Sequence, residues 1–227
     1  GSLNLGSADP ARFTPNLGTD FVEHMGSIIA ICLENVISNE MLKYIGLTDS
    51  LTGVYNRRYM DRRLIEETAR ARRQGYRLSC MYIDIDHFKR VNDSVGHQGG
   101  DDVLREVCGR IKAELRMSDA LGRFGGEEFV VLLIDADLES ASTVAHRIRA
   151  GVAAAPISLS GGERVDVTVS IGVAALSAQW SDPARDPVRD LAHDNPIEGV
   201  AQELVAAADA ALYQAKAAGR NKVVTFA

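Results

Sequence analysis

The segment that most constrains the fold is the apolar run "RLSCMYIDID", which extends from Arg77 to Asp86. Its apolar residues are nearly continuous instead of alternating with polar ones, which is typical of a central strand covered on both faces. Such a strand needs helices above and below it, and helical periodicity occurs on both sides of the run in the sequence. The pattern predicts an α/β or α+β fold, with a central mixed sheet surrounded by helices.

The other expected elements alternate along the chain after Asp49. Two runs of strand-forming residues flank Gly125-Gly126, and this arrangement predicts a β-hairpin. Gly219 is expected to end the last helix in a left-handed conformation. A polar segment with three prolines, 177–199, is expected to be a long surface loop. We expect helices over 57–73, 100–115, 138–153 and 200–218 and further strands over 120–124, 127–134, 166–176 and 222–226.

Composition excludes several classes of function. The net charge is −6 and the pI about 5.4, so no overall basic field would attract DNA, RNA or a membrane surface. No apolar run approaches the ~20 residues of a membrane span, and no signal peptide is visible. Cys32, Cys80 and Cys108 have no paired spacing, and we expect them to be buried thiols in a reducing compartment. These features predict a cytoplasmic protein.

The first 45 residues differ from the rest. Residues 1–19 are expected to be a tail or linker, or the end of an upstream sensor domain. The opening Gly1-Ser2 resembles a cloning scar, so we expect a fragment of a longer protein. Residues 20–45 have apolar side chains at three- and four-residue steps, which predicts an amphipathic linker helix. This helix could fold back on its own domain, but we favour parallel pairing between two copies of the chain.

Carboxylates gather where the central strand ends. Asp84 and Asp86 are two residues apart and therefore share one face of the strand. Close carboxylates repel one another unless a cation or a proton lies between them. For this pair alone, a polar strand end that caps the next helix is the better interpretation.

A second acidic pair, Glu127 and Glu128, follows the Gly125-Gly126 turn. Glycines there would let a ligand approach the backbone without meeting a Cβ. Adjacent strand residues point to opposite faces, so one glutamate could bind a metal while the other acts at the edge. Oxygen ligands from two neighbouring strands suit Mg²⁺ or Mn²⁺ bound together with phosphates. The hairpin alone would be a solvated turn, but the two clusters together favour a metal site.

Five further motifs follow one another along the chain. They are "DSLTGVYNRR" (49–58), "DIDHFKRVNDSVGHQGGD" (84–101), "RFGGEEF" (123–129), "VTVSIGVA" (167–174) and "ADAALYQAKAAGRN" (208–221). Together they resemble the GGDEF family of bacterial diguanylate cyclases. The resemblance covers about residues 46–227 and is specific because all five motifs occur at family-like spacing. It implies a palm-like nucleotidyl-cyclase fold and the condensation of two GTP molecules into cyclic di-GMP.

The resemblance also assigns roles to single residues. It implies two Mg²⁺ or Mn²⁺ ions per active site, held by Asp84, Glu127 and the carbonyl of Ile85. Glu128 is the expected protein base, with metal-bound hydroxide as a rival. The remaining GTP-binding residues would be the base-reading Asn92 and Asp101, and the phosphate-facing His87, Phe88, Lys89, Gly125, Gly126, Lys216 and Arg220. Without the resemblance, Asn92 and Asp101 would be a turn residue and a helix cap, and the two cations would be solvated. His97 is expected to be structural.

The implied reaction joins two GTP molecules, one on each of two domains. Two chains must therefore face each other as a homodimer, and the helix over 20–45 is a plausible device for pairing them under the control of an upstream sensor domain. "RMSD" (116–119) matches the register of the family's product-inhibition site. Arg116 and Asp119 would bind cyclic di-GMP there, with Arg147 as a secondary contact.

Three other functions remain as alternatives. A catalytically inactive receptor for GTP or cyclic di-GMP is the main one, although such relatives usually lose the acidic pair that this chain keeps. A cyclase for another dinucleotide is disfavoured by Asp101, which suits guanine. A purely structural role would leave five polar motifs unexplained.

Overall fold

The computed structural model describes residue 8, residues 20–176 and residues 196–226. The predicted tail over 1–19, apart from residue 8, and nearly all of the predicted loop over 177–199 lie outside these ranges. The chain forms two compact units, residues 1–46 and residues 47–227, and each is considered by itself.

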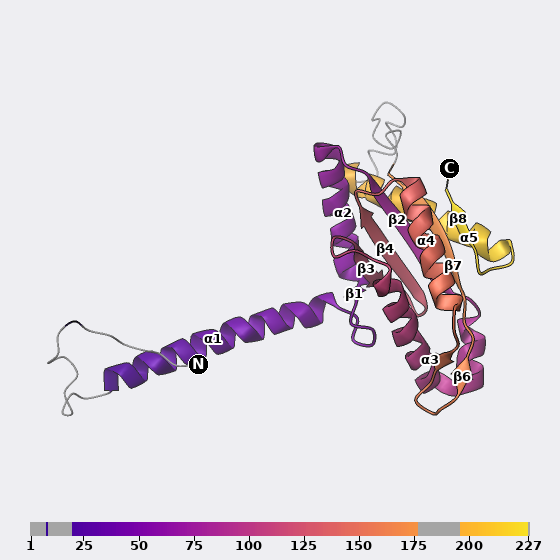
Figure 1. The fold of residues 1–227 in the computed structure, drawn as a ribbon. Coiled ribbons are helices and arrows are strands. Elements are labelled where there is room, and N and C mark those ends of the chain that lie inside the picture. The colour runs from indigo at the N-terminus through magenta and orange to yellow at the C-terminus, as the bar shows by residue number, and fades with distance from the viewer. Residues whose placement is uncertain (1–7, 9–19, 177–195, 227) are drawn as a thin grey trace. The chain divides into compact units, whose positions relative to one another are not determined.

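The second unit is built on a six-stranded mixed sheet with the order β1-β3-β4-β2-β7-β8 (Figure 1). The central strand β2 (Leu78–Ile85) is antiparallel to both neighbours, β4 (Glu128–Ile134) and β7 (Val169–Ala175). The outer strands are β3 (Ala120–Arg123), β1 (Tyr55–Asn56) and β8 (Val223–Thr225). The predicted hairpin is confirmed, because β3 pairs antiparallel with β4. A separate two-stranded sheet joins β5 (Ile157–Ser158) to β6 (Arg164–Val165).

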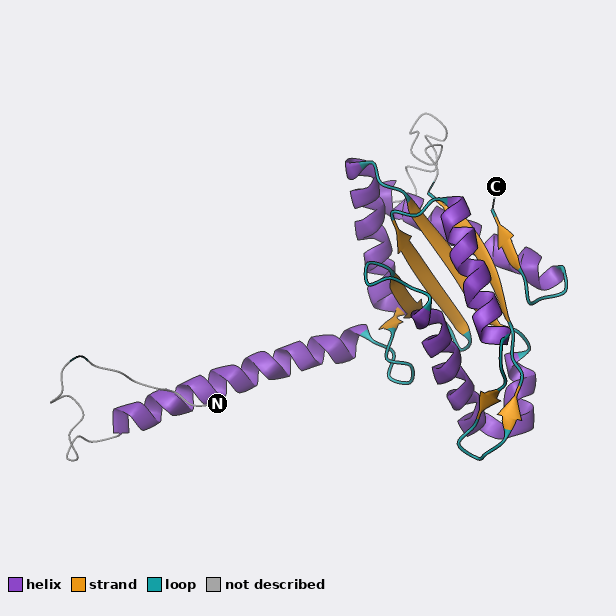
Figure 2. Ribbon diagram, in the orientation of Figure 1, coloured by secondary structure: helices purple, strands orange, loops and turns teal. Residues whose placement is uncertain are grey.

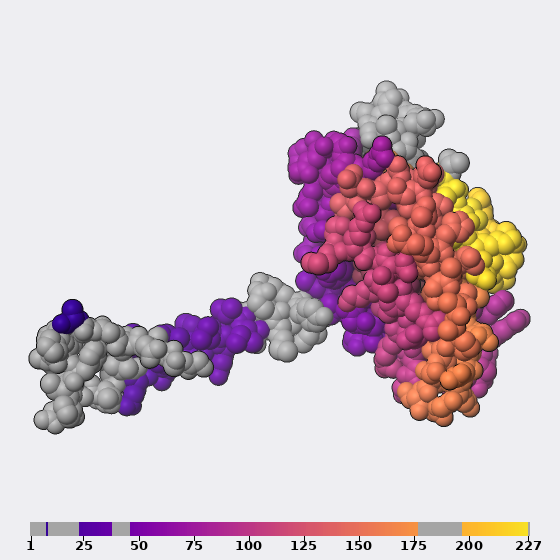
Figure 3. All heavy atoms as spheres, viewed as in Figure 1, coloured from indigo at the N-terminus to yellow at the C-terminus, as the bar shows by residue number. Residues whose placement is uncertain are grey.

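Helices cover both faces of the sheet, as the apolar run of β2 predicts (Figure 2). Odd-numbered β2 residues such as Met81 and Ile83 belong to one buried cluster, which includes side chains of α3 (Phe88–Ala113) and α4 (Leu138–Ala153). The even-numbered Leu78 and Cys80 belong to a second cluster with α2 (Arg57–Gln74) and α5 (Pro196–Ala217). This division follows directly from the two-residue period of a strand. Side chains from the middle of the chain, which include α3 and α4, cover the face seen in Figure 3.

Four helix ends follow the expected chemistry. Asn56 caps α2 by accepting a hydrogen bond from the Tyr59 N–H, and Gly75 ends that helix with φ of 74°. Asp137 caps α4 in the same way through the Ser140 N–H. Gly219 follows α5 with φ of 107°, the left-handed conformation predicted for it.

The helix predicted over 100–115 begins much earlier, and this part of the prediction was wrong. α3 starts at Phe88 and is broken at Gly96, where φ is 73° and ψ is 172°. The first part contains the polar residues Lys89, Arg90, Asn92 and Asp93, so it lacks a clear apolar period. The break places residues 88–95 and 97–113 in two helical segments with different directions.

The first unit contains α1 (Asp20–Leu47), slightly longer than predicted. Its central side chains are exposed, including those of Ile28 (61%), Ile31 (58%) and Ile37 (62%). Cys32 is exposed as well, so its predicted burial was wrong, whereas Cys80 and Cys108 are buried. The reason is that Cys32 lies on a helix whose apolar side chains have no cover within the described chain. No helix among the described residues has the length and apolarity that a membrane span requires.

Candidate active site

Acidic side chains meet at one end of the sheet. Because β2 is antiparallel to its neighbours, its last residues lie beside the first residues of β4 and β7. Asp84 is paired in register with Glu128 on one side and with Ser170 on the other. Directly opposed residues of antiparallel strands share a face, so Asp84 and Glu128 are on the face of the sheet that α5 covers.

Asp84 is a buried carboxylate, 6% exposed, with a cation beside it. Lys216 Nζ, in the last turn of α5, lies 2.7 Å from Asp84 Oδ2. Burial raises the pKa of Asp84 above its ordinary value, and the Asp86 charge adds to this, while Lys216 and Arg220 oppose it. The predicted phosphate contact Lys216 thus compensates the charge of the predicted metal ligand.

Glu127 lies in the hairpin turn immediately before β4. Its carbonyl accepts a hydrogen bond from the Ile85 N–H at 3.3 Å, which brings the turn against the end of β2. Desolvation raises the pKa of the Glu127 carboxyl, and the negative charge of Asp84 raises it further. Lys216 offsets part of this effect, so the two carboxylates repel each other without a further cation.

This pair fits a divalent cation bound together with phosphates. Within the described ranges, no group of three or more His, Cys, Asp or Glu side chains could hold a metal ion alone. Mg²⁺ commonly takes one or two carboxylates and completes its shell with water and substrate phosphates. The mutual repulsion of Asp84 and Glu127 is the feature that a cation would relieve.

The two glycines of the turn have different surroundings. A Cβ at Gly125 would overlap the Glu128 carboxylate, and the Gly125 N–H lies 3.4 Å from the Glu128 carbonyl. The space beside Gly125 is therefore filled by Glu128, not left for a ligand as the sequence analysis expects. Gly126 has open space where its Cβ would lie and lines a neighbouring pocket.

That pocket, of about 300 Å³, opens beside α3. Asn92 and Asp101, the predicted base-reading residues, line it together with Glu127. Both lie within α3, one in each helical segment, so the turn and helix-cap alternatives do not apply. The break at Gly96 lets the two segments present these side chains to one space. The pocket is lined by Phe88, Lys89, Asn92, His97, Asp101, Leu104, Arg123, Gly126 and Glu127.

Gly100 allows Asn92 to take its position. A Cβ at residue 100 would overlap Asn92 Oδ1 and lie 3.0 Å from Asn92 Cγ and 3.4 Å from the Phe88 ring. The Asn92 amide thus lies across the backbone of the second helical segment, where only glycine leaves room. His97 and Leu104, which the sequence analysis left out of the site, also line this pocket.

The predicted phosphate-binding groups surround the same end of the sheet. His87 precedes α3 with φ of 58°, and its side chain does not cap the first N–H groups of this helix. A helix N-terminus of this kind favours anions. Arg220 is exposed and follows α5 with φ of 62°. Its positive charge lowers the pKa of Asp84. Phe88 and Lys89 line the pocket.

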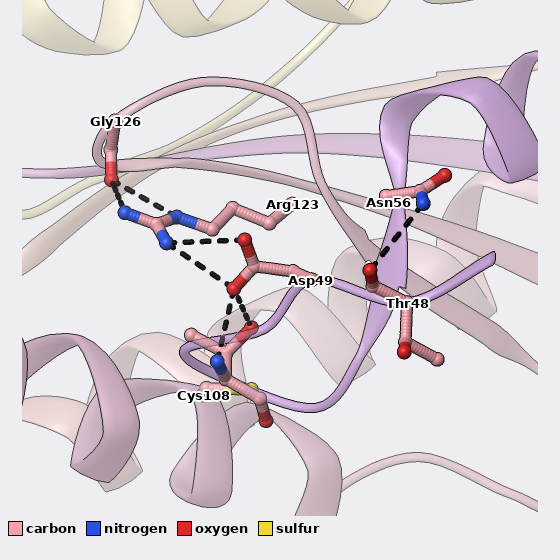
Figure 4. Close-up of polar contacts among 7 residues, drawn as sticks. Thr48, Asp49, Asn56, Cys108, Arg123 and Gly126 are labelled. Carbon is pink, nitrogen blue, oxygen red and sulfur yellow. Dashed lines mark hydrogen bonds and ion pairs between the residues drawn. The ribbon is translucent and has the colours of Figure 1, made fainter. Parts of the chain in front are cut away.

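Arg123 connects the hairpin turn to the segment after α1, a contact that the sequence analysis missed (Figure 4). Its guanidinium donates to the Gly126 carbonyl, at 2.6 Å from Nη2, and pairs with Asp49 at 3.2 Å. Burial raises the pKa of Asp49, but hydrogen bonds from Thr52 and the Arg123 charge outweigh burial and lower it overall. Asp49 of the "DSLTG" segment thereby fixes Arg123, which in turn holds the glycine turn through the Gly126 carbonyl.

The predicted product-binding residues lie in the segment before β3 and on α4. Asp119 accepts hydrogen bonds from the backbone N–H groups of Arg116 and Ile134, at 2.9 and 3.3 Å. Arg147 pairs with Glu114 at 2.8 Å. The exposed guanidinium of Arg116 makes no hydrogen bond or ion pair with any described residue. Asp119 and Arg147 keep further hydrogen-bonding positions besides these contacts, because a carboxylate has about four acceptor positions and a guanidinium five donors.

Comparison with known proteins assigns the family. The model described as "Diguanylate cyclase, GGDEF domain" matches residues 46–190, more than half of the chain. The chain belongs to the GGDEF family.

Its relatives agree with this assignment. Response regulator PleD of Caulobacter vibrioides is 41% identical over 181 residues, which cover 79% of this chain and 36% of PleD. Diguanylate cyclase DgcP of Pseudomonas aeruginosa is 40% identical over 177 residues, 78% of this chain and 23% of DgcP. The chain therefore spans about a third or less of the length of these curated relatives.

A solved structure resembles both the fold and the helix that precedes it. This is the coiled coil and GGDEF domain of DgcB from Caulobacter crescentus in complex with c-di-GMP, with a TM-score of 0.76 and 28% identity. The match covers 90% of this chain and 98% of that one.

Proposed function

We propose that this chain is an active diguanylate cyclase that joins two GTP molecules into cyclic di-GMP with the help of Mg²⁺ or Mn²⁺. The observation that carries the proposal is the arrangement of two carboxylates at the end of β2. Asp84 pairs with the cation Lys216, and Glu127, held against β2 by its backbone, lines the same pocket as Asn92 and Asp101. A divalent cation on the pair, phosphates near the cations and a base in the pocket would together form a nucleotide site.

Each GTP would be held at both ends. The carboxylate of Asp101 and the amide of Asn92 offer the acceptors and the donor that the guanine edge requires. The first N–H groups of α3, with Lys89, Lys216 and Arg220, would hold the triphosphate. Asp84, Glu127 and the Ile85 carbonyl would hold the cations, which supply charge neutralisation on the phosphates and a lower pKa of the attacking hydroxyl.

The reaction forms one phosphodiester bond on each of two GTP molecules. The 3′-oxygen of one GTP bonds to the α-phosphorus of the other, and the bond from that phosphorus to the bridging oxygen breaks, which releases pyrophosphate. Glu128 is proposed to accept the hydroxyl proton. The Glu128 carboxylate lies against Gly125. Burial raises the pKa of Tyr82 to about 12, and the negative charge of Glu128 adds to that rise.

Two chains are needed, because each domain presents one such site. We propose a homodimer in which the α1 helices pair through exposed side chains such as Ile28, Val36 and Ile37. The DgcB structure that this chain resembles includes a coiled coil, which supports this pairing. An upstream sensor domain in a longer protein would act through α1.

Product inhibition is the finer part of the proposal. The guanidinium of Arg116, which has no partner among the described residues, would bind a phosphate of cyclic di-GMP, and Asp119 and Arg147 would use their remaining hydrogen-bonding positions. A product molecule bridging two domains would keep their GTP sites apart.

The proposal is tested by incubating the chain with GTP and Mg²⁺ and assaying pyrophosphate and the nucleotide product. Glu127→Ala is expected to abolish product formation, whereas Glu139→Ala, an exposed position on α4, should leave it unchanged. Tight binding of GTP or cyclic di-GMP with no product from the unaltered chain would favour the inactive-receptor alternative.

A further inference from the structure

The turn that joins α5 to β8 has an unusual backbone. Gly219, Arg220 and Asn221 are consecutive residues with φ of 107°, 62° and 46°. Glycine adopts positive φ freely, but residues with a Cβ do so rarely and rarely in succession. Such a conformation persists where surrounding contacts determine it, and it is found more often at functional sites.

A buried carboxylate supplies one of those contacts. Asp86, immediately after β2, is 5% exposed and accepts a hydrogen bond from the Asn221 backbone N–H at 2.9 Å. Its two oxygens also accept hydrogen bonds from the hydroxyls of Thr168 and Ser170, each at 2.6 Å. Asp86 thus ties the end of β2 and the start of β7 to the turn before β8. The catalytic proposal above gives this residue no role.

Other contacts support the same turn from outside. Arg149 of α4 donates to the Asn221 side chain at 2.9 Å, and the Arg220 N–H donates to the Ala215 carbonyl at 3.1 Å. These contacts hold the side chain of residue 221 and the start of the turn. Asp86 holds the peptide N–H between residues 220 and 221, and this peptide sets the direction in which the Arg220 side chain leaves the backbone.

Arg220 lies close enough to the reacting end of the site for its charge to lower the pKa of Asp84, two residues before Asp86. Lys216, on the preceding helical turn, contacts Asp84 directly. The same short stretch of β2 therefore carries a carboxylate that faces the two cations and a carboxylate that fixes the turn bearing one of them.

We propose that Asp86 is a positioning residue that holds the Gly219–Asn221 turn in its left-handed conformation and thereby directs Arg220 to the triphosphate of GTP. This inference rests on the proposed function, since it takes GTP as the ligand. The alternative is that Asp86 only stabilises the end of the sheet. A positioning role lowers the affinity for the triphosphate and leaves the affinity for the guanine base unchanged. A purely structural role does not lower the affinity for the triphosphate selectively.

The test compares the affinities of two guanine nucleotides in the presence of Mg²⁺ by titration calorimetry. One is GMP, and the other is a GTP analogue with a methylene group between the α- and β-phosphates, which cannot release pyrophosphate. In Asp86→Ala, the preference for the triphosphate should fall roughly tenfold, the value of one charge-assisted hydrogen bond, while the affinity for GMP stays the same.

Two further variants show whether the effect passes through Arg220. Arg220→Ala should lower the preference by the same factor, and the double variant should lower it no further, because both changes remove one interaction. Ser170→Ala is the matched control: it removes a hydrogen bond from the other carboxylate oxygen and leaves the Asn221 contact in place. It should lower the melting temperature and leave the preference unchanged.

An unchanged preference in Asp86→Ala, or losses that multiply in the double variant, would overturn the inference. If Asp86→Ala does not fold, Asp86→Asn replaces it. The amide keeps the shape and one neutral acceptor, so a fall of about two- to fivefold is expected, and no fall would again overturn the inference. An unaltered chain that binds neither nucleotide would instead refute the proposed function.

Discussion

Gly100→Ala separates nucleotide binding from stability on a single helix. The new Cβ would overlap Asn92 Oδ1, so the amide must rotate away from its place in the pocket. The overlapping atom is the end of a flexible side chain, and its displacement costs the fold little. Alanine is also favoured over glycine inside a helix by about 1 kcal/mol. The variant should therefore keep its melting temperature or gain slightly.

The loss in nucleotide affinity follows from the hydrogen bonds of Asn92 to the base. Leaving a buried polar partner without its hydrogen bond costs about 1–3 kcal/mol. Each ~1.4 kcal/mol corresponds to a factor of ten, so the KM for GTP should rise roughly tenfold and at most about a hundredfold. The melting temperature and the affinity should thus change independently, or even in opposite directions.

The assay is a pair of measurements, thermal unfolding and GTP titration, on the same two variants. Gly109→Ala is the matched control, because Gly109 lies on the same helix with open space where its Cβ would be. It should gain up to about 1 kcal/mol of stability and keep the KM of the unaltered chain. A normal KM in Gly100→Ala would refute the role of Asn92, and an equal loss of stability and affinity would refute the argument from Gly100.

Three further outcomes follow from the site. Glu127→Gln should stabilise the metal-free protein at pH 7 by less than ~1 kcal/mol, seen as a higher melting temperature. The gain should shrink in acid, because the raised pKa of Glu127 means that its charged form, present at pH 7, disfavours the fold. A lower melting temperature of the variant at pH 7 would contradict this. Asp49→Asn should cost about 1–2 kcal/mol at neutral pH by removing the Arg123 pair. Because the pKa of Asp49 is lowered in the folded protein, this contribution is present at pH values above the ordinary pKa near 3.9 and is lost in stronger acid. The stabilities of the variant and the unaltered chain should therefore converge as the pH falls below that value, and a difference that stays constant would contradict this. Arg116→Ala should release feedback inhibition by cyclic di-GMP, and unchanged inhibition in initial-rate assays would remove that proposal.

Local patterns predicted much of the fold. The apolar run from Arg77 to Asp86 became β2, buried on both faces, and the Gly125-Gly126 turn became the β3–β4 hairpin. Both depend on the period of the chain and on turn residues, which are visible in a single sequence. The start of α3 was missed because only Phe88 and Val91 enter the core there, while polar side chains such as Asn92 line a pocket and Gly96 interrupts the period.

Features that depend on distant partners could not be predicted in this way. Arg123 and Asp49 are 74 residues apart, and Asp86 and Asn221 are 135 apart. In the sequence each is an ordinary charged or polar residue at an element end. Lys216 was predicted to contact phosphates. Its ion pair with Asp84 could not be predicted, because it depends on the position of α5 over the end of β2.

The most direct test of the central claim is the product formed from GTP and Mg²⁺ by the full chain over a dilution series, with nucleotides separated by chromatography. Our account predicts cyclic di-GMP, two pyrophosphates for each product molecule, and a rate per chain that falls as dilution separates the two sites. The absence of cyclic di-GMP at every concentration would contradict the cyclase, and a constant rate per chain down to the lowest concentration would contradict the need for two chains.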